Sequence, residues 1–334
     1  MSTPRLSIIG FIGLLLLVAC PLAFSSLAHA QATVTPDNGQ ALEIGPPVLS
    51  LSADPGQTIT ADISLRAISS TGLIVKGQVN DFVADGEDGT PRIVLDTSIP
   101  NPFSLRAWLS PLPVLDLRAN EVRKLTITIA VPSNASPGGY YGVVRFTGTP
   151  PELEGAGVSL SASLGTLLIL TVNGDAKEQL SIEQFFVSNK GKPGSLFESA
   201  PISFVERLKN TGNIQESPSG VVTVKDMFGR TVVTLGVNQP PRYVLPQSIR
   251  KFEQSMDETN IGNKILFGLY HADLTVKYGT SGQTVTSSVS FWVIPYRIIG
   301  AVIAGLIALF FILRFAVKRY KDYIIGIAGR SNRR

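Results

Sequence analysis

The residues best suited to chemistry form one acidic cluster beside two glycines, Gly86 and Gly89. The cluster consists of four carboxylates: Asp81, Asp85, Glu87 and Asp88. Converging carboxylate oxygens can hold calcium, but the spacing departs from that of an EF-hand loop, and no glutamate stands at the required distance after it. Aspartate and glycine are also standard turn residues. We therefore interpret the cluster as a solvated hairpin tip, with a calcium site as the alternative.

The rest of the chain offers few catalytic groups. Cys20 is the only cysteine, and His271 is the one histidine outside the first 30 residues. Without further histidine or cysteine, zinc and thiol catalysis are excluded by composition. Ser248 and Lys251 fit a loose Ser-x-x-Lys pattern, but in a strand they point to opposite faces, so we treat the match as coincidence. We predict no catalytic residue, no bound metal and no cofactor.

A membrane anchor is predicted near the carboxyl end. Residues 298–317 form a nearly continuous apolar stretch of 20 that is followed at once by Lys318, Arg319 and Lys321. At about 1.5 Å per residue, this stretch reaches the roughly 30 Å of a bilayer core. By the positive-inside rule, the basic tail at 318–334 is cytoplasmic and the preceding residues lie outside the cytoplasm. We interpret Arg314 as marking the end of the membrane span, because its long side chain can reach the lipid headgroups.

The amino terminus resembles a secretory signal. An apolar core from Leu6 to Val18 precedes a small-x-small motif, and the predicted cleavage separates Ala30 from Gln31. The segment before Cys20 also looks like a bacterial lipobox, so lipidation of Cys20 is the competing interpretation. Because a helix already anchors the chain, we favour cleavage after Ala30.

The charge of the exported part argues against nucleic acid as a partner. The whole chain carries a net charge of +4, but residues 31–296 hold 20 basic and 24 acidic residues. The excess of basic residues therefore belongs to the tail, where it is a topology signal. The same residues contain no cysteine, so hydrophobic burial and not disulfides must hold them together.

Alternating runs of β-branched and apolar residues predict an all-β fold for residues 31–296. Leu125, Ile127 and Ile129 alternate with polar residues, and a strand with one apolar face needs a second sheet across it. The predicted strands of the first domain are 48–53, 58–67, 73–83, 92–95, 105–109, 122–131, 140–146 and 158–172. A polar break after Asn173 marks the domain boundary.

The second domain is predicted to be a seven-stranded immunoglobulin-like sandwich without the disulfide. Its predicted strands are 180–187, 202–209, 221–226, 231–237, 249–254, 269–278 and 285–293. The predicted organisation is therefore a signal peptide at 1–30, an extension at 31–47, a first β-sandwich at 48–173, a second at 178–296, and the membrane helix.

This layout resembles the bacterial WxL-interacting type of cell-surface protein. The matching segments are Pro55-Gly56-Gln57, Gly138-Gly139-Tyr140-Tyr141, Asn210-Thr211-Gly212-Asn213, Val244-Leu245-Pro246 and Phe291-Trp292-Val293-Ile294-Pro295. The resemblance implies two immunoglobulin-like domains, one membrane helix, and peptidoglycan or another surface protein as partner. The first domain is also similar to PapD-like chaperone sandwiches.

Three functional hypotheses follow. The first is a non-enzymatic, membrane-anchored surface protein that binds cell-wall polymer or a partner surface protein. The second is a tethered envelope-assembly chaperone that lends a strand to its partner, which an exposed hydrophobic edge strand in the first domain would favour. The third, least favoured, is a carboxylate-based glycosidase, which requires two acids about 5–10 Å apart in a cleft.

Overall fold

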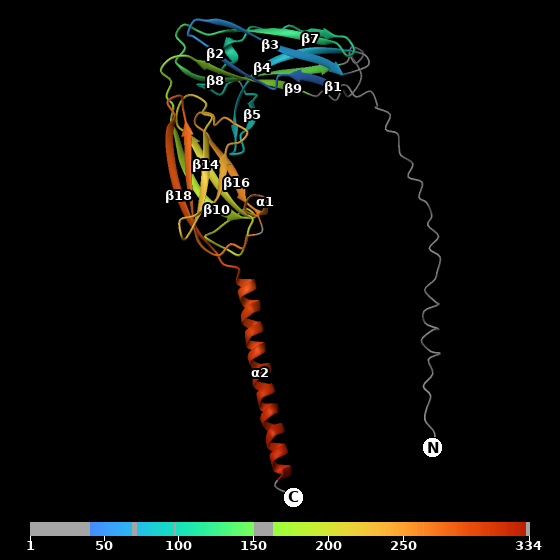
Figure 1. The fold of residues 1–334 in the computed structure, drawn as a ribbon. Helices are drawn as coiled ribbons and strands as arrows, with labels where there is room; N and C mark the ends of the chain where they lie inside the picture. The colour runs from blue at the N-terminus through green and yellow to red at the C-terminus, as the bar shows by residue number, and fades with distance from the viewer. Residues whose placement is uncertain (1–40, 69–71, 97, 150–162, 263, 332–334) are drawn as a thin grey trace, which may run out of the picture. The chain divides into compact units, whose positions relative to one another are not determined.

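The computed structural model describes residues 41–68, 72–96, 98–149, 163–262 and 264–331. Within it, residues 40–334 form one compact unit that contains two β-sandwiches and a long helix, as Figure 1 shows. The predicted signal peptide, its cleavage site and Cys20 lie outside the described residues. The all-β fold class with one carboxyl-terminal apolar helix is confirmed.

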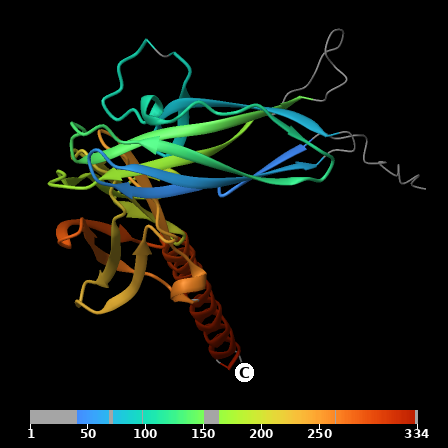
Figure 2. The same ribbon diagram turned by 90° about the horizontal axis from the view of Figure 1, so that it is seen from above.

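The first sandwich packs a three-stranded sheet on a larger one (Figures 1 and 2). The small sheet has the order β1 (Ala41–Gly45), β3 (Thr58–Ile68) and β7 (Val122–Ala130). The large sheet comprises β2 (Val48–Ala53), β9 (Ser163–Val172), β8 (Gly138–Thr149), β4 (Leu73–Asp85) and β5 (Thr90–Val94), and β6 (Leu115–Leu117) also pairs with β4. The predicted alternation in β7 is confirmed, because Leu125, Ile127 and Ile129 are buried.

Two sequence predictions for the first sandwich are corrected. The sandwich begins before residue 48, since β1 pairs with β3 and buries Leu42. Residues 105–109 are not a strand: Arg106–Trp108 is a single 3₁₀ turn, while Leu105 is fully buried and its amide donates to the Tyr141 carbonyl at 3.2 Å. A short apolar run that anchors a loop and one that forms a strand look alike in sequence. The first residues of the strand predicted at 158–172 lie outside the described ranges, and the strand is seen from Ser163.

The second sandwich has the predicted immunoglobulin-like architecture. One sheet has the order β11, β10, β13, β16 and the other β12, β18, β17, β14, β15. The long strands are β10 (Leu180–Asn189), β13 (Ile202–Asn210), β14 (Ser219–Asp226), β15 (Thr231–Val237), β16 (Ile249–Met256), β17 (Gly268–Tyr278) and β18 (Gln283–Val293). The shorter elements are β11 (Lys192–Pro193), β12 (Leu196–Phe197) and α1 (Glu258–Ile261).

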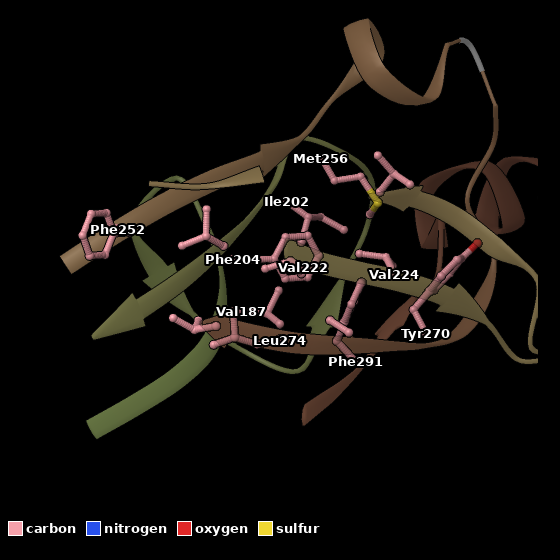
Figure 3. Packing of buried hydrophobic residues seen from close by; sticks show 14 of the residues in the cluster. Val187, Ile202, Phe204, Val222, Val224, Phe252, Met256, Tyr270, Leu274 and Phe291 are labelled. Carbon is pink, nitrogen blue, oxygen red and sulfur yellow. The ribbon is translucent and has the colours of Figure 1, made fainter. Parts of the chain in front are cut away.

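Aromatic rings fill the centre of this second core, as Figure 3 shows. Phe291 has no exposed surface and lies edge-on to Phe204, with ring centroids 5.7 Å apart. Tyr270 stacks on Phe291 at 5.6 Å, and Phe197 meets it edge-on at 6.0 Å. Phe291 thus contacts rings from three other strands, so its loss would leave a cavity that its neighbours cannot fill.

The chain ends in α2 (Tyr296–Ser331), which starts directly after Pro295. Among the described residues, it is the one helix long and apolar enough to cross a membrane. The qualifying part, Tyr296–Lys321, has 26 residues and a mean hydropathy of 2.6, and none of it is buried against the protein. The helix continues through most of the predicted tail.

We expect Phe291→Ala to lower the free energy of unfolding of the second sandwich by about 3–5 kcal/mol, because the ring is lost and a cavity remains. The full-length chain with Trp108→Phe keeps Trp292 as its sole tryptophan and reports on this sandwich by fluorescence during denaturation. Ser288→Ala, at an exposed position of the same strand, is the matched control. An equal effect of both substitutions would contradict the packing described here.

Candidate binding groove

The acidic cluster predicted from the sequence lies where β4 and β5 form a hairpin, and the predicted turn is confirmed. Its carboxylates do not converge. Asp81 is buried and accepts a hydrogen bond from Ser104 Oγ at 2.8 Å, whereas Asp85 pairs with Arg92 at 3.5 Å. Among the residues that the structure describes, no group of three or more acids, histidines or cysteines is placed to hold a metal ion.

The hairpin tip instead contacts the second sandwich. Arg207 Nε on β13 donates to Glu87 Oε2 at 2.7 Å, and Arg207 Nη2 donates to Glu87 Oε1. The Arg207 guanidinium holds the pKa of the Glu87 carboxyl below its usual value. The backbone takes part as well, since the Lys251 amide donates to the Glu87 carbonyl at 2.8 Å. The hairpin tip thus connects the two sandwiches and is only partly exposed to solvent. The sequence interpretation of a fully solvated tip is wrong in this respect.

A second set of hydrogen bonds also joins the two sandwiches. Tyr141 Oη donates to Gln215 Oε1 at 2.9 Å, and Gln215 Nε2 donates to Thr171 Oγ1 at 2.8 Å. The Gly139 amide donates to the Asn213 carbonyl at 2.8 Å. Burial raises the pKa of Tyr141, so its hydroxyl remains a neutral donor. These bonds form only when β8 and the turn at 210–216 are in register.

Between these two sets of contacts lies an apolar groove of about 360 Å³. Its first wall consists of side chains from the large sheet of the first sandwich, with Phe82 and Ile169 nearly buried and Val48 exposed. Its second wall is the segment at 241–250, which contributes Tyr243 and Leu245 to the same hydrophobic cluster. The volume and lining fall in the range of sites that take small molecules or extended peptide segments.

Two arginines border this apolar surface, Arg242 and Arg250. Arg250 is partly buried; its Nη1 donates to the Tyr243 carbonyl at 2.7 Å and its Nη2 to the Asp88 carbonyl at 3.3 Å. Burial lowers the pKa of Arg250, and the neighbouring Arg242 lowers it further. The ion pairs found among the described residues include neither arginine. Two cations beside an apolar groove thus retain their capacity to bind an anion.

Gly89 in the hairpin turn leaves the space that the Arg250 side chain occupies. Its φ is +75°, in the left-handed region that favours glycine, and a Cβ at this position would lie 2.2 Å from Arg250 Cζ. The sequence marked Gly89 only as a turn residue. The sequence analysis did not single out Arg242, Arg250 or Phe82 as binding residues, because the groove joins segments that are far apart in the chain. The local signal was the run Pro240-Pro241-Arg242-Tyr243, an irregular stretch with a cation beside an aromatic ring.

The other residues noted in the sequence either lie away from the groove or hydrogen-bond to the backbone of the segment that lines it. His271 is exposed, and its Nδ1 lies 2.8 Å from Ser290 Oγ. Ser248 Oγ donates to the Leu245 carbonyl at 2.7 Å, and Lys251 is exposed. One hollow contains two acids, Asp88 and Glu253, but the cations Arg242 and Lys251 line it as well.

A carboxyl group lies inside the second core. Glu206 has no exposed surface and occupies a core-facing position of β13 between Phe204 and Leu208. Burial raises the pKa of Glu206 to about 9, and the nearby Glu253 carboxylate adds to the shift. The amide nitrogen of Gln254, with the amide turned toward it, lies 2.6 and 2.8 Å from the two carboxyl oxygens. Burial therefore favours the protonated acid over the carboxylate at neutral pH.

Comparison with known proteins shows a similar architecture in fimbrial chaperones. A class 5 fimbriae chaperone, CfaA, is 14% identical, with 74% of this chain and 98% of that chain covered and a TM-score of 0.36. A chaperone–tip adhesin complex of CFA/I fimbriae is 15% identical, with 76% of this chain and 98% of that chain covered and a TM-score of 0.38. The E. coli chaperone DraB is 14% identical, with 76% of this chain and 97% of that chain covered and a TM-score of 0.33. At this identity and TM-score, the likeness concerns the architecture alone.

No protein-family model matches the sequence, and no curated protein matches it. The resemblance to the WxL-interacting type therefore stays a prediction.

We expect Glu206→Gln to stabilise the protein increasingly as the pH rises. The folded-state pKa is raised above the ordinary value of 4.5, so the native state binds the proton more tightly, and stability falls between about pH 4.5 and 9. Removing the ionisable group should raise the free energy of unfolding on the order of 3 kcal/mol at pH 7 and hardly change it at pH 4. Denaturation curves across this range measure the effect.

Glu183→Gln is the control, because Glu183 is an exposed glutamate on β10 in the same sheet. Its effect should stay below about 1 kcal/mol and vary little with pH. A pH-independent effect of Glu206→Gln would show that the carboxyl is not protonated in the fold.

Proposed function

We propose that this chain is a membrane-anchored, extracytoplasmic protein without catalytic activity that binds a partner protein of the cell surface. The anchor is α2, and Lys318, Arg319 and Lys321 at the end of its apolar part hold that end in the cytoplasm by the positive-inside rule. Both sandwiches then lie on the outer side, where their architecture suits binding and envelope assembly.

The groove with Arg242 and Arg250 at its border carries this proposal, because no ion pair among the described residues includes either side chain. Its apolar floor fits the side chains of an extended segment, while Arg242 and Arg250 fit a carboxylate on that segment. The partner is therefore an apolar, acid-bearing stretch of protein. Cell-wall polymer fits less well, because the floor is formed by buried and partly buried apolar side chains such as Phe82, Ile169 and Leu245 rather than by polar groups.

A strand-lending chaperone is the second candidate, and the start of β9 favours it. Within the described ranges, Ser163, Leu164 and Gly165 pair with β8 and with no strand on their other side, because β2 begins to pair with β9 at Leu167. Leu164 in this stretch is 42% exposed. An uncovered edge with an apolar residue is a template for pairing with another chain.

We expect the full-length protein to bind a short fluorescent peptide of alternating valine and aspartate and not its valine–asparagine counterpart. The double variant Arg242→Gln/Arg250→Gln should weaken this binding at least about tenfold, because two charge-assisted contacts are lost. Arg66→Gln, which removes an exposed arginine on β3, is the matched control. Fluorescence polarisation measures the affinity. Equal binding of both peptides, or competition by soluble peptidoglycan fragments instead, would contradict the proposal.

The strand-lending candidate is tested by a photocrosslinking residue at position 164 in intact cells. We expect this crosslinker to capture a defined surface protein. If the partner also occupies the groove, adding Val48→Asp should abolish the capture; if it does not, the capture should persist. Crosslinking confined to wall polymer would rule out a protein partner at this edge. A crosslinker at Thr286, an exposed position of β18, controls for chance encounters.

A further inference from the structure

Exposed apolar side chains gather at one end of the second sandwich. They are large residues that a soluble domain would normally bury, with exposed fractions between 45% and 77%: Leu196, Met227, Phe228, Ile265, Phe267 and Trp292. We call these six residues the apolar rim. Single exposed apolar residues are ordinary, but a group of them at one end marks a surface that contacts something other than water.

Strand pairing places the rim at the end where the chain enters α2. Leu196 is the register partner of Trp292, and Gly268 is that of Val293 at the end of β18. Gly268 directly follows Phe267. The β14–β15 turn lies beside it, because Asp226 pairs with Tyr270, and a Cβ at Gly268 would lie 1.9 Å from Met227 Cε. Segments from four separate parts of the chain therefore present apolar tips at the same end.

The connection to the helix is too short to lift this end away from a bilayer. Only Ile294 and Pro295 separate β18 from the apolar part of α2, which begins at Tyr296. Three residue steps span at most about 10–11 Å of extended chain. If α2 crosses a membrane, the end of β18 lies within the interfacial layer, and neighbouring strands about 4.8 Å apart bring the other tips to a similar depth.

The chemistry of the rim suits that layer. Phe and Trp rings favour the boundary between headgroups and acyl chains. Arg230 lies with its guanidinium 5.2 Å from the centre of the Phe228 ring, and Lys264 is exposed next to Ile265. These two cations can remain at the phosphates while the neighbouring Phe228 and Ile265 side chains enter the apolar region.

We propose that the apolar rim inserts into the outer interface of the same membrane that α2 crosses, so that the second sandwich lies on the lipid surface. This inference rests on the proposed membrane anchoring. Its consequence is that the anchor is not a flexible tether: the tips and the helix together restrain the second sandwich against the bilayer. The partner of this surface is therefore lipid.

The test uses the full-length chain with Cys20→Ser, reconstituted into nanodiscs of phosphatidylcholine and phosphatidylglycerol. Spin labels are attached to Phe228→Cys or Phe267→Cys. Ser281→Cys is the matched control, since Ser281 is exposed in the β17–β18 turn at the opposite end of the same strands. We expect the first two labels to be several-fold more accessible to oxygen, and less accessible to a water-soluble nickel complex, than the third.

The outcomes separate the two proposals. If the chain stays with the discs and all three labels are equally accessible to nickel, the rim does not contact lipid, while the anchoring stands. If the chain leaves the discs, both the anchoring and the lipid contact are overturned. A full-length Phe228→Ser/Phe267→Ser variant adds a second measurement. A spin label at Arg230→Cys should be more accessible to the nickel complex in this variant than in the chain with both phenylalanines. An unchanged accessibility would also overturn the proposed lipid contact of the apolar rim.

Discussion

The two-sandwich structure depends on burying one face of each sheet against another without a covalent cross-link. Because residues 31–296 contain no cysteine, the two sandwiches rely on apolar layers such as that of β3 and β7 in the first domain and the rings around Phe291 in the second. Strand alternation fixes which residues enter these layers. Loops, grooves and rims are then the places where the chain has freedom to carry function.

Polar groups inside this frame are few and each has a structural consequence. Asp81 is satisfied by Ser104, so a residue that resembled a metal ligand in sequence holds a loop against a sheet. Glu87 takes a bidentate contact from Arg207 and joins the two sandwiches. Glu206 instead stays among apolar side chains as a neutral acid. The carboxylates thus differ by environment and not by type, which is why sequence spacing alone could not distinguish their roles.

The groove and the apolar rim have different roles in the proposed function. The groove lies where both sandwiches contribute walls, so its shape depends on the contacts of Glu87 and Tyr141 that hold the sandwiches in register. The rim lies at the far end of the second sandwich, next to the helix. The proposed binding of a partner and the proposed contact with lipid therefore involve different parts of the second sandwich.

The sequence by itself determined the all-β class, most strands, the turn at Gly86 and Gly89, and the apolar helix, because each follows from local periodicity, turn chemistry or length. It failed at residues 105–109 and at β1, where a short apolar run can be a loop anchor or a strand. Only the tertiary structure decided which acids meet arginines, which residues line the groove, and that Phe228, Phe267 and Trp292 share one end of a sandwich. These are contacts between segments far apart in the chain, and the pairing and packing of distant strands bring them together.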